Sequence, residues 1–267
     1  MKSLLLTVWL ATAAFAAQMV PAQTVAAQTA SAQAPPSLPP YVAAALADPG
    51  RSFQQPTDAR RKPGELVAFS GLKPGDKVVD LIPGSGYFTR IFSKVVGPKG
   101  HVYALWPNEY AAESHPDPEN TQKLAQDPAY GNITALQQPA AAFTTPERVD
   151  MVFTSQNYHD YPDKFMGKVD PMAFDRAVFK ALKPGGVFFI VDHVAQAGSG
   201  MRDTDTLHRI DPAIVRTQVT AAGFVFVGES DVLRNPADDH AKAVFDPSIR
   251  GHTDQFIYKF RKPRQRA

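Results

Sequence analysis

Short apolar runs with the length of buried strands alternate with helical stripes along most of the chain. Residues 77–82 form the first run, and residues 88–96 follow with apolar side chains at helical spacing. The same patterns predict further strands at 101–106, 132–136, 149–154, 187–194, 224–227 and 254–260, and further helices at 58–69, 118–126, 174–182 and 215–222. This alternation predicts an α/β fold with a parallel sheet that helices cover on both faces.

The end of the chain departs from the alternation. A long loop at 234–253 follows the sixth predicted strand, and no crossover helix precedes the last strand at 254–260. Because a parallel neighbour needs such a crossover, the last strand is expected to run antiparallel. We therefore predict one domain at 58–263, with a Rossmann-like, seven-stranded, mostly parallel sheet and an antiparallel last strand.

The first 22 residues have the composition of a secretory signal peptide. After Lys2 no charged residue occurs before Asp48, and residues 4–17 are apolar except for two threonines. Small residues near the end of this segment suit signal peptidase, and the run is short for a membrane span. We expect export to a bacterial periplasm without stable membrane insertion after cleavage; an alanine-rich disordered leader is the alternative. Residues 23–57 are expected to form a linker and N-terminal extension.

Composition excludes several classes of protein. The 28 basic and 26 acidic residues leave a net charge of +2, which is too close to balance to predict a nucleic-acid partner. The chain has no cysteine, so disulfides, iron–sulfur clusters and thiol nucleophiles are excluded. It also lacks the G-x-S-x-G motif of serine hydrolases. No pattern in the sequence sets an oligomeric state.

A glycine-rich turn joins the first predicted strand to its helix. Gly84 and Gly86 stand where a side chain would keep a ligand away from the backbone, at the carboxyl end of a central strand. The dehydrogenase fingerprint needs a third glycine where Thr89 stands. It also needs an acid at the end of the second strand, where this chain has Trp106. The turn therefore predicts a ligand site that differs from a dinucleotide site.

Two segments resemble motifs of one enzyme family. Residues 78–89, with the sequence VVDLIPGSGYFT, resemble the first motif of class I S-adenosylmethionine-dependent methyltransferases. The turn at 182–186 resembles the family's turn into its fifth strand, and the final loop and strand fit its antiparallel last strand. The resemblance covers residues 65–262. The sequence TSQNYHD at 154–160 is similar to a signature of a group of predicted exported bacterial methyltransferases.

The resemblance implies S-adenosylmethionine as the cofactor and methyl transfer to an oxygen or nitrogen of a small acceptor. Asp80 matches the family acid that holds the amino group of the cofactor. The family acid after the second strand falls near Trp106, so Asn108 or Glu109 is expected to reach the ribose instead. Residues 137–139 replace the acid after the third strand. The implied cofactor-binding residues are Asp80, Pro83, Gly84, Ser85, Gly86, Tyr87, Asn108 and Asn157.

Chemistry is expected in the loop after the fourth strand. Unperturbed imidazole titrates near physiological pH, and Asp160 adjoins His159, so we predict that His159 is a general base. Asn157 and Tyr158 are expected to shape the pocket. The alternative for all of these residues is structural: a loop histidine bonded to backbone, and simple loop packing. The predicted catalytic residues are His159, Tyr158 and Asp160.

Two other functions stay open. Five residues could gather as metal ligands, but no H-x-x-x-H or H-E-x-x-H spacing supports this, and no metal site is predicted; they are His159, Asp192, His193, His208 and Asp211. The altered positions near Trp106 and 137–139 also leave room for an exported protein that binds a nucleoside or other small molecule without methyl transfer.

Overall fold

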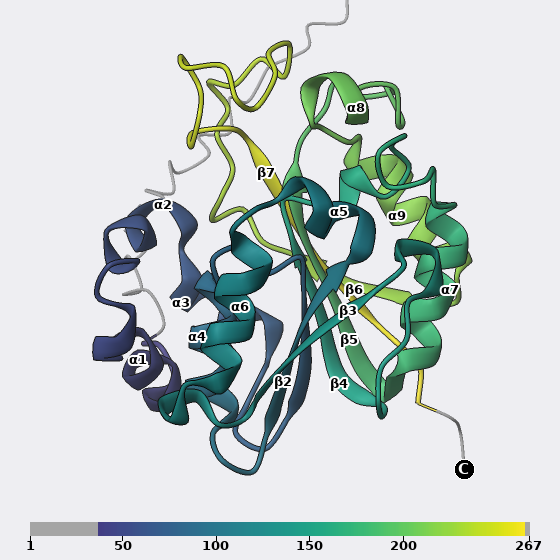
Figure 1. The fold of residues 1–267 in the computed structure, drawn as a ribbon. Coiled ribbons are helices and arrows are strands. Elements are labelled where there is room, and N and C mark those ends of the chain that lie inside the picture. Colours follow the sequence, from purple (N-terminus) through teal and green to yellow (C-terminus); the bar gives the residue numbers. More distant parts are fainter. Residues whose placement is uncertain (1–36, 265–267) are drawn as a thin grey trace, which may run out of the picture. The chain divides into compact units, whose positions relative to one another are not determined.

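The computed structural model describes residues 37–264, and within this range seven strands form one sheet in the order β3-β2-β1-β4-β5-β7-β6 (Figure 1). The strands β1 to β5 are parallel, and β7 lies between β5 and β6 and runs antiparallel to both. This confirms the predicted fold class, including the antiparallel last strand. The strands are β1 (Lys77–Leu81), β2 (His101–Pro107), β3 (Ile133–Gln138), β4 (Val149–Ser155), β5 (Leu182–His193), β6 (Val225–Glu229) and β7 (Gln255–Arg261).

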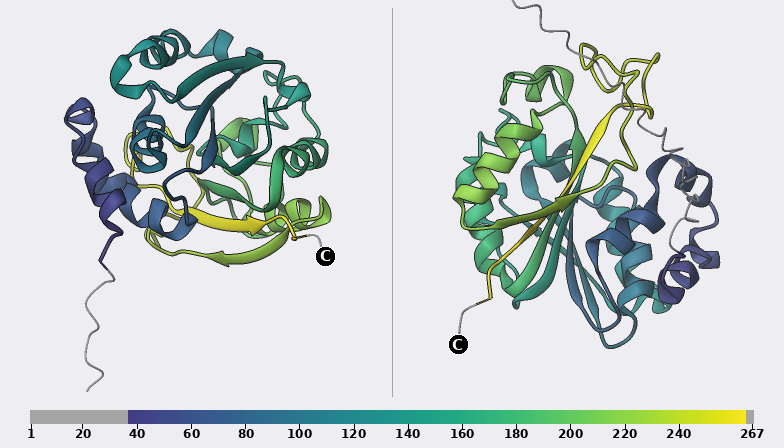
Figure 2. Two further views of the ribbon diagram at one scale, coloured as in Figure 1. Left: turned by 90° about the horizontal axis from the view of Figure 1, so that it is seen from below. Right: turned by 180° about the vertical axis from the view of Figure 1, so that it is seen from behind.

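Helices pack on both faces of the sheet (Figure 2). On one face the stripe of α4 supplies Phe88 and Phe92, whose ring centroids lie 4.7 and 4.9 Å from that of Phe153 on β4. On the other face Phe174 of α7 and Val219 of α9 are buried against the sheet. The α-helices are α1 (Pro40–Leu46), α2 (Asp58–Arg61), α3 (Pro63–Ser70), α4 (Tyr87–Val96), α5 (Asn108–Glu113), α6 (Asp117–Gln126), α7 (Pro171–Ala181), α8 (Thr204–Leu207) and α9 (Pro212–Ala221).

The folded unit begins before the predicted domain boundary at residue 58. Helix α1 packs against α3 and α4 and buries Val42 and Ala45. Arg51 is fully buried and makes two bonds to Asp58, at 2.7 and 3.0 Å. The compact unit therefore starts near residue 37. The predicted signal peptide, and the linker as far as residue 36, lie outside the described residues, so export stays a prediction.

Local breaks explain where the helices differ from the sequence pattern. The predicted helix at 58–69 is two helices, because Lys62 adopts φ +47° immediately before Pro63. The short helices α5 and α8 were not predicted, since neither contains two full turns of apolar periodicity. Between residues 37 and 264, no helix has the length and apolar character needed to cross a membrane.

Candidate functional site

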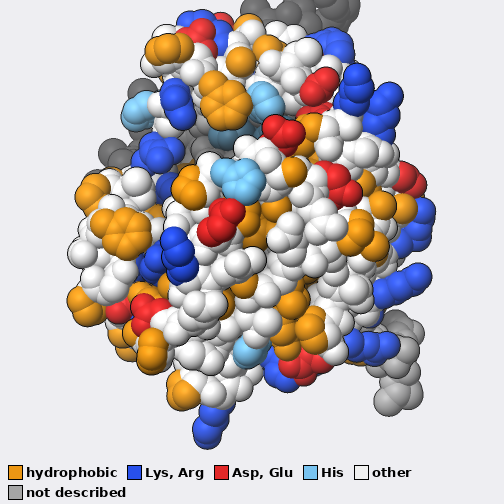
Figure 3. Space-filling view, in the orientation of Figure 1, with side chains coloured by type: hydrophobic (Ala, Val, Ile, Leu, Met, Phe, Trp, Pro, Cys, Tyr) orange, Lys and Arg blue, Asp and Glu red, His pale blue; other side chains and the backbone are white. Residues whose placement is uncertain are grey.

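A cleft of about 850 Å³ lies at the carboxyl ends of β1, β2, β4 and β5. It includes the point where β1 and β4 are neighbours and the chain order of the sheet reverses, which is where open α/β sheets bind ligands. Figure 3 shows histidine and acidic side chains gathered in the upper half of this face, above the sheet. The cleft is the best candidate site in the described part of the chain.

The tips of β1 and β4 are strained and held together. Ile82 and Gln156 adopt φ values of +52° and +66°, a region that residues with a side chain rarely enter and that is costly for a β-branched one. The Asn157 amide donates to the carbonyls of Leu81 and Ile82, both at 3.3 Å, and its oxygen accepts from Thr154. Strained backbone held by such bonds is typical of functional sites.

The two glycines of the turn have different environments. Gly84 lines the cleft at φ +57°, and a Cβ added there would meet no heavy atom within 4 Å. Gly86, at φ +77°, faces packed atoms instead: its Cβ would lie 2.8 Å from Leu124 Cδ2 and 3.0 Å from Arg90 Nη1. Gly84 therefore keeps the cleft open for a ligand, whereas Gly86 allows α6 to pack close to the turn. Gly86 does not line the cleft, and its contact with the cofactor stays a prediction.

Several predicted cofactor residues lie away from the cleft. Asp80 is 2% exposed and accepts a bond of 2.6 Å from Thr89 on α4. Burial raises the pKa of Asp80 to about 7, although Thr89 and Arg61 favour its ionised form. The Tyr87 hydroxyl donates to Asp58 at 2.6 Å. Of the predicted set, Pro83, Gly84 and Asn157 line the cleft, and Asp80, Ser85, Gly86, Tyr87 and Asn108 do not.

Sequence reasoning missed Arg61, the last residue of α2, which lines the cleft. Its guanidinium lies 4.5 and 4.8 Å from the ring centroids of Tyr87 and Phe88, and Nη2 is 3.4 Å from Ser155 Oγ. Burial lowers the pKa of Arg61, while Tyr87 and Asp80 act in the opposite direction. No carboxylate within residues 37–264 forms an ion pair with it. This partly buried cation can therefore receive an anionic group of a ligand.

His159 is fixed between two carboxylates. Its Nδ1 lies 2.8 Å from Asp192 Oδ1, its Nε2 lies 3.2 Å from Asp160 Oδ1, and its backbone N–H donates to Asp192 Oδ2 at 2.9 Å. Burial alone would lower the pKa of His159, but Asp192 and Asp160 raise it well above its ordinary value. Both ring nitrogens face carboxylate oxygens, so neither is free to accept a proton from an acceptor in the cleft. The structure does not support the predicted role of His159 as a general base.

Tyr158 points into the core rather than into the cleft. Its side chain is 1% exposed, and its hydroxyl donates to Asp175 at 3.1 Å. The ring packs beside Phe174 and Phe188, with centroids 6.4 and 6.3 Å away. The structure therefore does not support the predicted catalytic role of Tyr158, which anchors the loop against α7. Asp160, the third predicted catalytic residue, does line the cleft.

Three further histidines line the cleft, His115, His193 and His208, and the last two lie near His159. His208, at the end of α8, places Nδ1 3.7 Å from Asp160 Oδ1. One ligand atom each of His159, Asp160 and His208 lies within 4.8 Å of the others. His193 instead bonds through Nδ1 to Thr253 at 2.7 Å, and burial lowers the pKa of His193 to about 3, so it is neutral. Sequence spacing gave no sign of this cluster because His208 comes from a distant segment.

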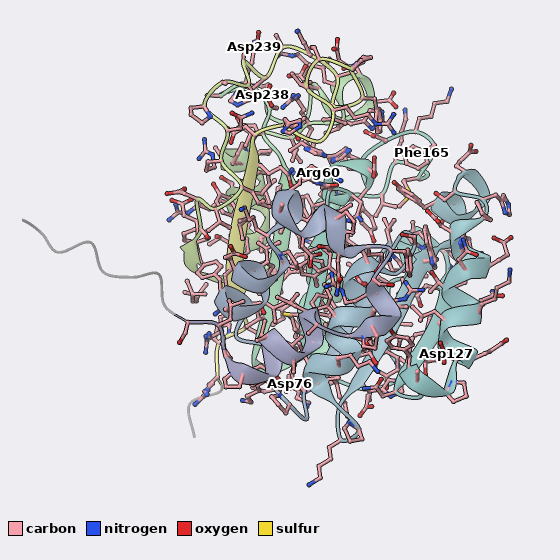
Figure 4. All side chains as sticks on the ribbon, turned by 90° about the vertical axis from the view of Figure 1, so that its left-hand side faces the viewer. Arg60, Asp76, Asp127, Phe165, Asp238 and Asp239 are labelled. Atoms are coloured by element: carbon pink, nitrogen blue, oxygen red, sulfur yellow. The ribbon has the colours of Figure 1, made fainter. Side chains whose placement is uncertain are left out.

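The loop after β6 has a structural role. Asp238 forms a fully buried ion pair with Arg209 at 2.9 Å, and Asp254 accepts from Arg234 and His240. Figure 4 shows Asp238 and Asp239 at the end of the molecule opposite Asp76. Within this loop, Val244 and Phe245 reach the cleft wall. Asp211, which the sequence offered as a metal ligand, instead caps α9: its side chain accepts a hydrogen bond from the backbone N–H of residue 213.

The side of the cleft expected to hold a ribose has a different acid from the predicted one. Glu109 is engaged elsewhere, since its Oε2 accepts from the backbone of Ala140 at 2.9 Å. Asp117, at the start of α6, lines the cleft together with Trp106, and partial burial raises the pKa of Asp117. Asn108 and Glu109 do not line the cleft, whereas Asp117 does. The sequence pattern did not indicate Asp117, because it lies on α6 and not directly after β2.

Comparison with known proteins supports a methyltransferase fold. No family model matches the chain. It is 31% identical over 194 residues to the ubiquinone/menaquinone biosynthesis C-methyltransferase UbiE of Vibrio vulnificus, covering 72% of this chain and 64% of that protein. Across such curated relatives the chain spans 43–65% of their length.

Solved structures give the same result. A S-adenosylmethionine-dependent methyltransferase from Aquifex aeolicus superposes with a TM-score of 0.57 at 17% identity, over 79% of this chain and 96% of that one. The [4+2]-cyclase SpnF superposes with a TM-score of 0.58 at 18% identity, over 77% of this chain and 81% of that one. The described residues therefore have the Rossmann-like fold of class I methyltransferases. These relatives also agree with the predicted cofactor, whereas the narrower resemblance to an exported group stays a prediction.

Proposed function

We propose that the chain is an S-adenosylmethionine-dependent methyltransferase that acts on an oxygen or nitrogen of a small-molecule acceptor. The observation that carries the proposal is the cleft at the junction of β1 and β4, where Gly84 leaves open space and Asn157 holds both loops. The curated relatives, which are named as C-methyltransferases, and the fold neighbours support S-adenosylmethionine-dependent methyl transfer. The choice of an oxygen or nitrogen acceptor is part of the proposal and does not come from them.

The residues of the cleft fit the cofactor's charged and polar ends. Arg61 offers a cation to the carboxylate of the methionine portion, and a guanidinium is the preferred partner of a carboxylate. Asp117 offers a carboxylate to the ribose hydroxyls, beside the Trp106 ring. The cofactor supplies a methyl group on a sulfonium, and in-line displacement mainly requires alignment. These side chains provide that alignment.

The outer wall of the cleft suits a flat, largely apolar acceptor. Tyr110 and Phe165 stand edge to face with centroids 5.6 Å apart. Phe245 stands against His208 at 4.9 Å and is 56% exposed. Exposed aromatic rings around a polar floor are typical of small-molecule sites. An aromatic acceptor with a hydroxyl or amine would therefore place its polar atom near Asp160.

The decisive measurement is isothermal titration of the purified protein with S-adenosylmethionine and S-adenosylhomocysteine. Saturable binding of both, followed by methyl transfer to an aromatic acceptor, is the expected result. The cyclase SpnF shows that one fold serves different reactions, so binding must be followed by an assay of transfer. Absence of binding would contradict the proposal and favour a binding protein for another nucleoside or small molecule.

Replacing Gly84 with asparagine is expected to weaken S-adenosylmethionine binding at least about tenfold, a change of about 1.4 kcal/mol. Asparagine tolerates the positive φ of this position, so its main effect is bulk in the cleft. Gly75→Asn is the matched control, because Gly75 also has a positive φ of +88° and open space around its Cβ. Titration of both variants checks the prediction. Equal affinities in the two variants would place the cofactor away from the β1 turn.

Replacing Arg61 with glutamine should weaken binding by about tenfold to a hundredfold, since a charge-assisted bond contributes about 1.5–3 kcal/mol. The matched control is Arg60→Gln, because Arg60 is the exposed neighbour on the same helix (Figure 4) and does not line the cleft. A cofactor derivative whose carboxylate is esterified has no negative charge for Arg61 to bind. Its affinities for wild type and Arg61→Gln should therefore differ less than those of the cofactor itself. A similar loss in both arginine variants would point to general electrostatics rather than a contact.

A further inference from the structure

We propose that His159, Asp160 and His208 form a binding site for a divalent transition-metal ion of the Zn²⁺ type in the wall of the cleft. The site is independent of the methyl-transfer proposal, because it is defined by its own ligand atoms. Within the described residues, these three are the group whose ligand atoms approach one another closely enough to hold an ion.

The spacing of the ligand atoms agrees with such an ion. Metal–ligand bonds of about 2.0–2.2 Å place neighbouring ligands of a tetrahedral ion about 3.3–3.6 Å apart. Asp160 Oδ1 lies 3.2 Å from Nε2 of His159 and 3.7 Å from Nδ1 of His208. These two distances match the spacing around a tetrahedral ion, and the ligand atoms of all three residues lie within 4.8 Å of one another. An ion bound there would replace a proton between His159 and Asp160.

A carboxylate orients the first ligand. Asp192 contacts both the backbone N–H and the ring Nδ1 of His159, at 2.9 and 2.8 Å, and is fully buried. Metal-binding histidines are usually held in this way, because the bond at one ring nitrogen fixes the tautomer and directs the other nitrogen to the metal. With Nδ1 occupied by Asp192, Nε2 is the nitrogen that faces Asp160.

The ligand types select the metal and leave a position open. Two imidazoles and one carboxylate suit Zn²⁺, Co²⁺ and similar ions better than Mg²⁺ or Ca²⁺, which prefer oxygen ligands. All three residues line the cleft, and His208 is partly exposed, so a fourth ligand can come from the cleft side. If the proposed function holds, that ligand is the acceptor oxygen or nitrogen, which places the acceptor next to the glycine turn.

The test is a titration of metal-free, untagged protein with Co²⁺, followed by visible spectroscopy, and with Zn²⁺ followed by calorimetry. We expect one ion per chain, with the absorption of tetrahedral Co²⁺, displaced by Zn²⁺. His208→Asn should weaken binding at least about tenfold, because a ligand is lost. His115→Asn is the matched control: this exposed histidine also lines the cleft but lies outside the cluster, and its loss should leave affinity unchanged.

Three results would overturn the proposal: no binding by the wild type, equal binding by His208→Asn, or equal affinity for Mg²⁺ and Zn²⁺. Thermal melts of the metal-free variants show whether each one folds, and His208 is exposed enough for replacement without loss of the core. S-adenosylmethionine titration of the same samples is a separate readout. Metal binding without cofactor binding would support this site and contradict the proposed function. Cofactor binding without metal binding would support the proposed function and contradict this site.

Discussion

Replacing Arg209 with methionine is expected to lower the free energy of unfolding by about 3–5 kcal/mol, the cost of breaking a buried ion pair by removing one partner. Arg209 and Asp238 are fully buried as side chains, and their closest atoms are 2.9 Å apart. Arg209 also donates to the carbonyls of Val194 and Lys242, both at 2.8 Å. The substitution would leave a buried carboxylate and two carbonyls without their partner.

Arg202→Met is the matched control for this measurement. Arg202 also pairs with an aspartate, Asp203, through two bonds of 2.8 and 2.9 Å, but its side chain is 64% exposed. Exposed pairs contribute at most about 1 kcal/mol, so this variant should change stability little. Chemical denaturation of both variants provides the comparison. Similar small losses would mean that the Arg209 pair is solvated in solution.

The Arg209 pair also has a consequence for the cleft. Its bond to the carbonyl of Lys242 fixes the segment that carries Val244 and Phe245 into the cleft wall. The double variant Arg209→Met with Asp238→Leu removes both charges together and should recover part of the lost stability. Because neither Arg209 nor Asp238 lines the cleft, the stability of the single and double variants measures the ion pair itself.

The fold could be predicted from the sequence because its signals are local and repeated. Each buried strand is an uninterrupted apolar run, and the stripe of α4 is visible in its residue spacing. Even the antiparallel direction of β7 followed from the loop that replaces a crossover helix. The break between α2 and α3 was harder to predict, because a proline such as Pro63 is compatible either with a bent helix or with the start of a new one.

The site was predicted less well, because it depends on where side chains point and on contacts between distant segments. Two motif residues, Gly84 and Asn157, line the cleft, but the motif could not show that Tyr158 turns into the core or that Gly86 faces α6. Arg61 and His208 reach the cleft from short helices without a strong pattern. The adjacent residues His159 and Asp160 do touch, as the sequence suggested, but the contact occupies the nitrogen that a base would need.

A second large effect is expected from Asp80, whose burial makes folding depend on pH. The pKa of Asp80 is raised to about 7, from an ordinary value of 3.8. The folded state therefore holds this proton more tightly than the unfolded chain does. The stability that the proton contributes is complete below about pH 4 and is lost as the pH rises through about 7. The difference between the two pKa values corresponds to about 4 kcal/mol.

Replacing Asp80 with asparagine should remove this pH-dependent loss. The variant keeps the shape of the side chain and an oxygen that can accept from Thr89, but it has no charge to bury. We expect wild type and variant to have similar stability near pH 4, and the variant to be more stable by up to about 4 kcal/mol at pH 8. Thr89→Val is the complementary variant: it removes the bond that favours the ionised carboxylate, so the loss of stability should continue to a higher pH. Urea denaturation from pH 4 to pH 9 measures all three proteins, and parallel curves for wild type and Asp80→Asn would show that Asp80 ionises normally in the folded protein.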